Sequence, residues 1–231
     1  MNAIILAGGF GTRLKSVVSE LPKPMAPVAG RPFLEWVLDH CLLHKIEKAI
    51  LSVGYLHEKI IEHFGYEYKG MPLDYAIEEE PLGTGGAIRF ALEKSKGEEL
   101  WTVLNGDTLF RGNLNALANY YIEKNADMVL ALRRMYDFDR YGVVELDSLG
   151  EVNSFMEKSY QTEGLINAGV YIFRAALLQA HFSFAEKFSF EKDFMERFVK
   201  DLNFYGLEQE GYFIDIGIPA DFEKANQELL K

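Results

Sequence analysis

The chain has 231 residues, of which 48% are hydrophobic and 26% are charged, and its formal net charge is −11. This length and apolar content suit one large α/β domain, or two small ones, with a sizeable core. The acidic balance argues against a protein that wraps duplex nucleic acid, because such proteins need clustered Lys and Arg. We therefore expect no nucleic-acid partner, although an acidic protein can still hold a local basic pocket for a phosphate.

Cysteine use and the first residues indicate the compartment. Cys41 is the only cysteine, so no disulfide can form within the chain, which fits a reducing environment. The opening stretch MNAIILAGG has no basic leader and is typical of a strand rather than a signal peptide. No apolar stretch approaches the ~20 residues that a membrane helix needs. We expect a cytoplasmic protein with no membrane partner.

Short apolar runs alternate with helical patterns through the first half of the chain. The predicted strands are 3–7, 48–54, 73–79, 100–107 and 127–134, and the predicted helices are 33–45, 56–65, 86–95 and 114–125. This alternation predicts right-handed βαβ units. The expected fold class is therefore α/β, with a Rossmann-like, mixed but mostly parallel sheet and helices on both faces.

The second half has a different character. Its predicted strands, joined by short polar turns, are 141–147, 151–157 and 166–174, and its predicted helices are 190–202 and 219–231. A more antiparallel section is expected there. We expect a single domain over residues 1–231, whose halves, 1–135 and 136–231, share one sheet and form a cleft where they meet.

Polar or glycine residues follow three of the predicted strands. Gly8 follows the first strand, Glu78 lies at the end of the third and Asp107 at the end of the fourth. In open α/β sheets, ligands bind outside the carboxyl ends of the strands. The sequence therefore predicts a site at this edge of the sheet.

A glycine-rich turn follows the first strand. Gly8, Gly9 and Gly11 would let backbone N–H groups approach a phosphate without a Cβ in the way. The turn does not match a P-loop. The dinucleotide fingerprint would need its third glycine where this chain has Leu14, which disfavours a nicotinamide or flavin oxidoreductase.

Two cations accompany the turn. The guanidinium of Arg13 could grip phosphate oxygens with two parallel hydrogen bonds. Lys23 lies between Pro22 and Pro24, whose fixed φ angles restrict its backbone, so its ammonium suits a point-charge contact. A solvated loop with two surface cations is the simpler interpretation, but the whole constellation favours a phosphate site.

These motifs carry a family resemblance. GGFGTRL followed by PKPM resembles the signature of the sugar-1-phosphate nucleotidylyltransferases, and the resemblance continues through EEEPLGTGGAI, NGD, YGVV, MEK, NAGVYIF and FIDIGIPADF. It covers nearly the whole chain. It implies an enzyme that joins a nucleoside triphosphate to a sugar 1-phosphate, with a nucleotide-binding half at 1–135 and a sugar-phosphate-binding half at 136–231.

The resemblance also implies a catalytic set. Asp107 and Asp215 would bind Mg²⁺, which is usually held by one or two carboxylates plus substrate phosphates. Arg13 would hold the leaving phosphates, and Lys23 and Lys158 would offset the repulsion between the two anionic substrates. For isolated motifs, Asn-Gly-Asp would be a plain turn and Asp215 a buried structural acid.

A larger set would bind the nucleotide. By resemblance, it comprises Leu6, Ala7, Gly8, Gly9, Gly11, Thr12, Glu78, Glu80, Pro81, Gly83 and Thr84. A carboxylate can accept hydrogen bonds from both N1–H and N2–H₂ of guanine. The carbonyl oxygens of uracil or thymine are acceptors themselves and would repel it. Either Glu78 or Glu80 is therefore expected to read guanine, although three successive acids also suit a solvated surface.

The residues predicted to bind the sugar 1-phosphate are also implied by the resemblance. Its implied residues are Gly142, Glu157, Lys158, Asn167 and Gly169. Two positions depart from the family pattern, namely Ser159, where Pro is common, and Ile218, where Thr is common. Neither would be a direct ligand.

Within the family, the chain most resembles guanylyltransferases that act on D-glycero-α-D-manno-heptose 1-phosphate for surface glycans. GTP and heptose 1-phosphate are the expected substrates. A mannose-1-phosphate guanylyltransferase and an N-acetylmuramate-1-phosphate uridylyltransferase are the enzymatic alternatives. A non-catalytic nucleotide-sugar sensor is the alternative from another class, and a homodimer stays open.

Overall fold

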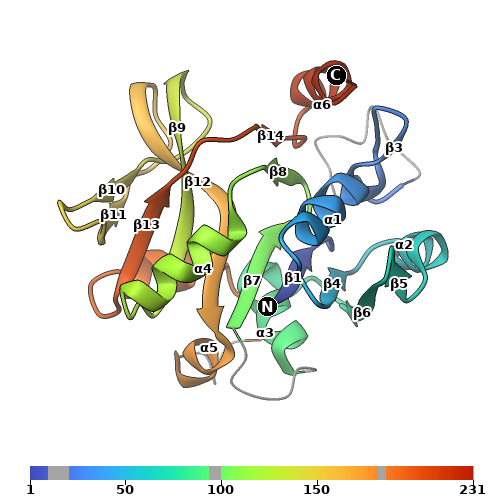
Figure 1. The fold of residues 1–231 in the computed structure, drawn as a ribbon, viewed down its shortest axis with the longest axis horizontal. Coiled ribbons are helices and arrows are strands. Elements are labelled where there is room, and N and C mark those ends of the chain that lie inside the picture. Colours follow the sequence, from blue (N-terminus) through green and yellow to red (C-terminus); the bar gives the residue numbers. More distant parts are fainter. Residues whose placement is uncertain (10–20, 94–99, 182–185, 231) are drawn as a thin grey trace.

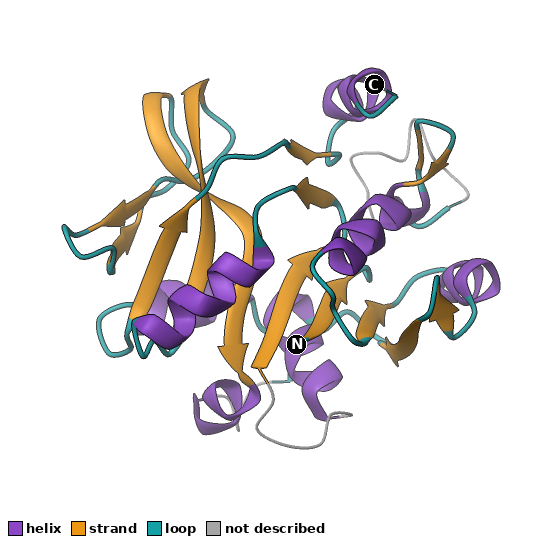
Figure 2. Ribbon diagram, in the orientation of Figure 1, coloured by secondary structure: helices purple, strands orange, loops and turns teal. Residues whose placement is uncertain are grey.

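The computed structural model describes residues 1–9, 21–93, 100–181 and 186–230. These residues form an eight-stranded sheet at the centre of the molecule (Figures 1 and 2). In spatial order, its strands are β13 (Phe204–Glu208), β9 (Met128–Phe138), β12 (Gln161–Arg174), β7 (Leu100–Asn105), β1 (Asn2–Leu6), β4 (Ala49–Val53), β6 (Met71–Ile77) and β5 (Glu67–Tyr68).

The sheet is mixed but mostly parallel, as expected. β1 pairs in parallel with β4 and β7, and β4 with β6. β12 runs antiparallel to both β7 and β9, while β13 is parallel to β9. The short edge strand β5 is also antiparallel to its neighbour β6. The long antiparallel strand β12 comes from the second half of the chain and joins the parallel block of the first half within one sheet.

Helices cover both faces of the sheet. One face carries α1 (Phe33–Leu43), α2 (His57–Phe64) and α4 (Leu114–Glu123), and the other carries α3 (Gly83–Glu93), α5 (Ala175–His181) and the π-helix η3 (Phe190–Glu196). Figure 1 shows α1 and α4 crossing in front of the sheet, with α3 behind it. Strand residues alternate between the faces, Ile5 toward the first and Ile4 toward the second. Parallel strands buried on both faces read as continuous apolar runs, which is why the sequence revealed them.

Within the described residues, three short two-stranded ribbons lie outside the main sheet. They pair β2 (Pro27–Val28) with β3 (Arg31–Pro32), β8 (Thr108–Phe110) with β14 (Phe213–Asp215), and β10 (Val144–Leu146) with β11 (Val152–Phe155), all antiparallel. The 3₁₀ turn η2 (Lys23–Met25) precedes the first ribbon, and α6 (Pro219–Glu228) follows the second. The ribbon β8–β14 brings together two segments that are far apart in the sequence.

Several predicted elements need correction. The strands expected at 141–147 and 151–157 shorten to β10 and β11. The helix expected at 190–202 is the shorter π-helix η3, and α3 begins at Gly83 rather than at residue 86. Gly85 and Gly86 therefore belong to the first turns of a helix, where they pack against the segment around Phe188; a Cβ on Gly85 would lie 2.1 Å from the Phe188 ring.

No helix in the described part of the chain is long and apolar enough to cross a membrane.

Candidate active site

Two pockets meet at the carboxyl ends of the parallel strands. The first, which we call the glycine-lined pocket, has a volume of about 270 Å³. The second, which we call the charged pocket, has a volume of about 690 Å³ and lies on the side of β12. Both pockets are lined by Asn105, the last residue of β7, and by Asp107, two residues further on. The two pockets therefore form one continuous candidate site with a shared edge.

The glycine-lined pocket depends on close backbone approach. Gly106 donates its N–H to the carbonyl of Leu6 at 2.9 Å, and a Cβ there would lie 2.6 Å from that oxygen. A Cβ on Gly8 would lie 2.8 Å from Oε1 of Glu78. Side chains at these positions would push β1 away from its neighbours and fill the space in front of Glu78.

Glu78 is held at both carboxylate oxygens. The hydroxyl of buried Ser52 donates to Oε1 at 2.9 Å, and the backbone N–H of Leu82 donates to Oε2 at 3.0 Å. Each oxygen retains a second lone pair for a ligand. The carboxylate therefore presents a fixed pair of acceptors to the pocket, whereas Glu80 is exposed and lines neither pocket.

The charged pocket forms around an irregularity in β12. The register between β12 and β9 shifts between Asn167 and Tyr171, and Gly169 has a φ of +73° within this stretch. The side-chain oxygen of Asn167 accepts from the N–H of Gly169 at 2.9 Å, and its amide donates to the Tyr171 hydroxyl at 2.8 Å. A Cβ on Gly169 would lie 2.7 Å from the amide nitrogen of Asn105. The irregularity thus brings the Gly169 stretch of β12 against Asn105 at the shared edge.

The shared edge carries two carboxylates and one ammonium. Asp215 is the register partner of Thr108 in the β8–β14 ribbon, and the N–H of Ile216 donates to the carbonyl of Asp107 at 3.0 Å. The ammonium of Lys23 lies 2.5 Å from Oδ2 of Asp107 and 3.9 Å from Oδ1 of Asp215. Asp107 and Asp215, which are 108 positions apart in the chain, therefore converge on the ammonium of Lys23.

Electrostatics at this edge favour added positive charge. Burial raises the pKa of Asp215, and the negative charge of Asp107 raises it further. Lys23, the N–H of Gly217 and Arg140 lower this pKa, but they do not outweigh the first two effects. The pair therefore carries an electrostatic repulsion that a divalent cation between the carboxylates would relieve.

The donor set fits a cation that is partly held by substrate. In the described residues, no group of three or more His, Cys, Asp or Glu side chains is arranged to hold a metal. Two hard carboxylate ligands suit Mg²⁺, which keeps several waters and binds substrate phosphates. Asn105 adds a buried side-chain oxygen that has no hydrogen-bond partner among the described residues and could accept from a ligand.

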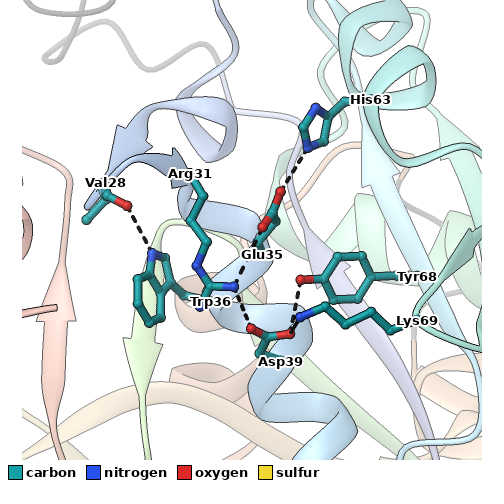
Figure 3. A network of polar contacts seen from close by, with 8 residues as sticks. All are labelled: Val28, Arg31, Glu35, Trp36, Asp39, His63, Tyr68 and Lys69. Atoms are coloured by element: carbon teal, nitrogen blue, oxygen red, sulfur yellow. Dashed lines mark hydrogen bonds and ion pairs between the residues drawn. The ribbon is translucent and has the colours of Figure 1, made fainter. Parts of the chain in front are cut away.

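The segment after Lys23 is fastened to α1. The indole N–H of Trp36 donates to the carbonyl of Val28 at 3.1 Å, and the guanidinium of Arg31 lies 3.6 Å from the centroid of the Trp36 ring (Figure 3). Arg31 also donates to Asp39 at 2.5 Å and pairs with Glu35 at 3.6 Å. These contacts hold the β2–β3 ribbon, and with it the short turn that carries Lys23.

Asp39 extends this anchor to the edge of the sheet. Tyr68 and Lys69 donate to its Oδ1 at 3.0 and 2.7 Å (Figure 3). Burial alone would raise the pKa of Asp39, but hydrogen bonds from Lys69, Arg31 and Tyr68 outweigh it and lower the pKa. The β2–β3 ribbon, which follows Lys23, also contacts α6, where the side-chain oxygen of Asn226 accepts from the N–H of Ala29 at 2.9 Å.

The structure places most sequence-predicted residues in the two pockets. The glycine-lined pocket is lined by Leu6, Gly8, Gly9, Lys23, Glu78, Pro81, Gly83 and Thr84 of the predicted set. The charged pocket is lined by Gly142, Glu157, Lys158, Asn167, Gly169 and Asp215. Ala7 is buried and does not line the first pocket. Gly11, Thr12 and Arg13 lie outside the described residues.

Several pocket residues were not expected, and Asn105, Arg140 and Glu191 are the ones with a clear polar role in the site. Asn105 precedes the NGD aspartate by two positions, and Arg140 immediately precedes YGVV, so nearby motifs could have suggested both. Glu191 accepts from the Thr84 hydroxyl at 2.7 Å and lines the charged pocket, which links the two pockets. Nothing in its local sequence signals this contact.

Comparison with known proteins gives consistent matches. A family model described as nucleotidyl transferase matches residues 2–231. A D-glycero-alpha-D-manno-heptose 1-phosphate guanylyltransferase from Aneurinibacillus thermoaerophilus is 50% identical over 230 residues, covering 99% of this chain and 98% of the relative. An enzyme of the same name from Campylobacter jejuni is 45% identical over 222 residues, covering 96% of this chain and 97% of that relative.

Solved structures agree with the fold. HddC from Yersinia pseudotuberculosis is 36% identical, with a TM-score of 0.88 and coverage of 99% of both chains. A second structure of that protein, in complex with GMP-PN, has a TM-score of 0.87. The expected fold class is thus confirmed by the sheet itself and by these neighbours.

Proposed function

Because the chain belongs to the nucleotidyl transferase family, we propose that it transfers GMP from GTP to D-glycero-α-D-manno-heptose 1-phosphate, forming GDP-heptose and pyrophosphate. The observation that carries this proposal is the shared edge, where Asp107 and Asp215 converge on Lys23 between a glycine-lined and a charged pocket. The names of the two most similar relatives described above support the choice of sugar, and the GMP-PN complex of the structural neighbour supports the choice of base.

The glycine-lined pocket is proposed to hold GTP. The fixed acceptor pair of Glu78 would receive N1–H and N2–H₂ of guanine, since both of its oxygens retain a free lone pair. Gly8 and Gly9 would let the backbone lie against the nucleotide. Arg13, which lies outside the described residues, would hold the β- and γ-phosphates.

The charged pocket is proposed to hold the sugar 1-phosphate. Glu157 and Asn167 would bind sugar hydroxyls, with Gly142 and Gly169 lining the pocket, and Lys158 would attract the phosphate. A phosphate oxygen would attack the α-phosphorus in line, and pyrophosphate would leave on the opposite side. Such a reaction needs positioning and charge neutralisation rather than a covalent nucleophile.

Asp107 and Asp215 would hold a divalent cation, which we take to be Mg²⁺, and when bound it supplies neutralising charge to the phosphates. Lys23 would then be released from its pairing with Asp107 to meet a phosphate. Lys23 lies in a 3₁₀ turn between Pro22 and Pro24, which restricts its backbone and so limits the distance over which its ammonium can move. The residues of the chain thus bring two anions together and fix their orientation.

We further propose that the protein acts in the cytoplasm, in the synthesis of a surface glycan such as a capsule, lipopolysaccharide or S-layer. Residues 1–135 and 136–231 would serve as nucleotide-binding and sugar-phosphate-binding halves of one domain. A homodimer is compatible with this function, and sedimentation equilibrium would measure the assembly state directly.

A pyrophosphate-release assay tests the proposal. The purified protein is given Mg²⁺ and each of GTP, ATP, UTP and dTTP, paired with heptose 1-phosphate or mannose 1-phosphate. We expect release to be fastest with GTP and heptose 1-phosphate. Faster release with mannose 1-phosphate would reassign the sugar, a preference for UTP would overturn the base assignment, and no release with any pair would favour a nucleotide-sugar sensor.

A further inference from the structure

Arg140 is a cation of the charged pocket that the sequence motifs did not reveal. It lies between the end of β9 at Phe138 and the start of β10 at Val144, and its side chain is 35% exposed. Its guanidinium lines the charged pocket together with Asp215 and Lys158. It is therefore accessible from the side on which a sugar 1-phosphate would enter.

The guanidinium bridges two carboxylates. Its Nη1 donates to Asp221, in the first turn of α6, and its Nη2 lies 3.9 Å from Oδ2 of Asp215. The first contact is a hydrogen bond, whereas the second is longer than one. Asp221 therefore fixes the Nη1 side of the guanidinium. The Nη2 side faces the shared edge, and its N–H donors remain available to a ligand.

Charge at the shared edge explains why such a cation is needed. Asp107 and Asp215 contribute two negative charges against the single ammonium of Lys23. A sugar 1-phosphate that approaches this edge brings further negative charge. An arginine guanidinium is not deprotonated in proteins, so it is a permanent positive charge beside Asp215.

We propose that Arg140 is a catalytic residue that binds the phosphate of the sugar 1-phosphate through its Nη2 side, and that Asp221 is its positioning residue. This inference rests on the proposed function of the same site. A phosphate bound there would lie next to Asp215, as attack on the α-phosphorus requires. Arginine is suited to the task because its planar fork can contact Asp221 and a phosphate at once, which a lysine ammonium cannot do with the same geometry.

Steady-state kinetics of Arg140→Ala and Arg140→Lys test the assignment. With GTP saturating, we expect kcat/KM for heptose 1-phosphate to fall roughly 10- to 100-fold in Arg140→Ala, as for loss of a charge-assisted hydrogen bond, and by less in Arg140→Lys. KM for GTP should stay within about twofold. Guanidinium chloride at millimolar concentration should restore part of the activity of Arg140→Ala.

Arg134→Ala is the matched control. Arg134 lies on β9, the strand that precedes Arg140 in the chain, and it also pairs with two carboxylates, those of Glu163 and Glu208, but it lines neither active-site pocket. This variant should keep the kinetic constants of the parent enzyme. Thermal melting of every variant shows whether it is folded.

A binding measurement separates the phosphate contact from turnover. Calorimetric titration of heptose 1-phosphate into the protein in EDTA should show weaker binding for Arg140→Ala, and intermediate binding for Asp221→Asn, in which Arg140 keeps its charge but loses its anchor. A folded Arg140→Ala with parental sugar affinity and kinetics would overturn the inference. A rise in KM for GTP alone would also overturn it, because the contact would then lie on the nucleotide side.

The two proposals fail in different ways. If the parent protein releases no pyrophosphate from any substrate pair, the proposed function fails. If the parent is active and Arg140→Ala behaves like Arg134→Ala, the function stands and the role of Arg140 fails.

Discussion

The glycine-lined pocket and the charged pocket are built in different ways. The first is made of backbone at the ends of parallel strands, together with one carboxylate that Ser52 and Leu82 hold at both oxygens. The second is made of charged and polar side chains around an irregular antiparallel strand. The shape of a pocket lined by backbone is fixed by the strand register of the sheet, whereas the shape and charge of a pocket lined by side chains can change with a single substitution. The comparison therefore predicts that the nucleotide side is rigid and that the sugar side sets the specificity within the family.

Removing a carboxylate at the shared edge should have the largest effect, because both pockets depend on it. We expect Asp107→Asn to lose about a thousandfold or more in turnover, or about 4 kcal/mol of transition-state stabilisation. The fold should remain, since the isosteric amide can still face Lys23. Pyrophosphate release and thermal melting measure the two effects, with Asp74→Asn on β6 as a control outside both pockets. Normal activity in Asp107→Asn would refute the role of this residue.

Glu78→Gln should affect the glycine-lined pocket alone. The substitution replaces one acceptor oxygen by an amide NH₂, which would face an N–H donor of guanine. We therefore expect kcat/KM for GTP to fall roughly 10- to 100-fold while KM for the sugar 1-phosphate changes little. The ratio of GTP to UTP use should fall as well. The equivalent change at exposed Glu80 should leave this ratio unaltered. If Glu80→Gln alters base preference and Glu78→Gln does not, the fixed acceptor pair is not the base reader.

Gly169→Ala should damage the charged pocket, which Gly169 itself lines, more than the glycine-lined pocket, which it reaches only through Asn105. A Cβ there must displace Asn105 and also adopt a φ of +73°, which L-residues disfavour, at a cost of about 1–3 kcal/mol. The melting temperature should fall by about 2–4 °C per kcal/mol. Gly70→Ala is the matched control, because Gly70 has a φ of +88° but open space around its Cβ position. If both variants show the same KM for the sugar 1-phosphate, the close approach at Gly169 does not shape the pocket.

The smallest expected effect is a pH-dependent change in stability at Asp215. Its pKa is raised above the ordinary 3.8, so the folded protein holds this proton to higher pH than the unfolded chain. Stability is therefore lost as pH rises from about 3.8 through the folded pKa, and the loss persists at neutral pH. Without divalent ions, Asp215→Asn should melt above the parent at pH 7, and the gap should narrow toward pH 4.5. A lower melting temperature for the variant at pH 7 would contradict this electrostatic account.

The sequence predicted the parallel half of the fold well, because its strands are continuous apolar runs and its helices have clear periodicity. It missed β8 and β14, which have only three residues each and show no period. Those two strands bring Asp215 to Asp107, so the sequence could name both acids but could not show how they meet. The end of a predicted strand pointed to Asp107, whereas the family motifs alone supplied Asp215.

The choice between Glu78 and Glu80 needed the structure for a similar reason. Both lie in a run of three acids, and only the end of β6 at Ile77 decides which one faces the pocket. The bridge from Arg140 to Asp221 joins residues 81 positions apart and depends on where α6 docks. Such contacts are set by tertiary packing, which a single sequence does not encode in any local pattern.

The central claim is that Asp107 and Asp215 share one divalent cation. Crystals grown with Mn²⁺ and a non-hydrolysable GTP analogue would test it most directly through the anomalous signal of the metal. We expect one strong peak within about 2.0–2.3 Å of an oxygen from each carboxylate, with the Lys23 ammonium moved off Asp107. A metal bound by one carboxylate alone, with the other still paired to Lys23, would contradict the account.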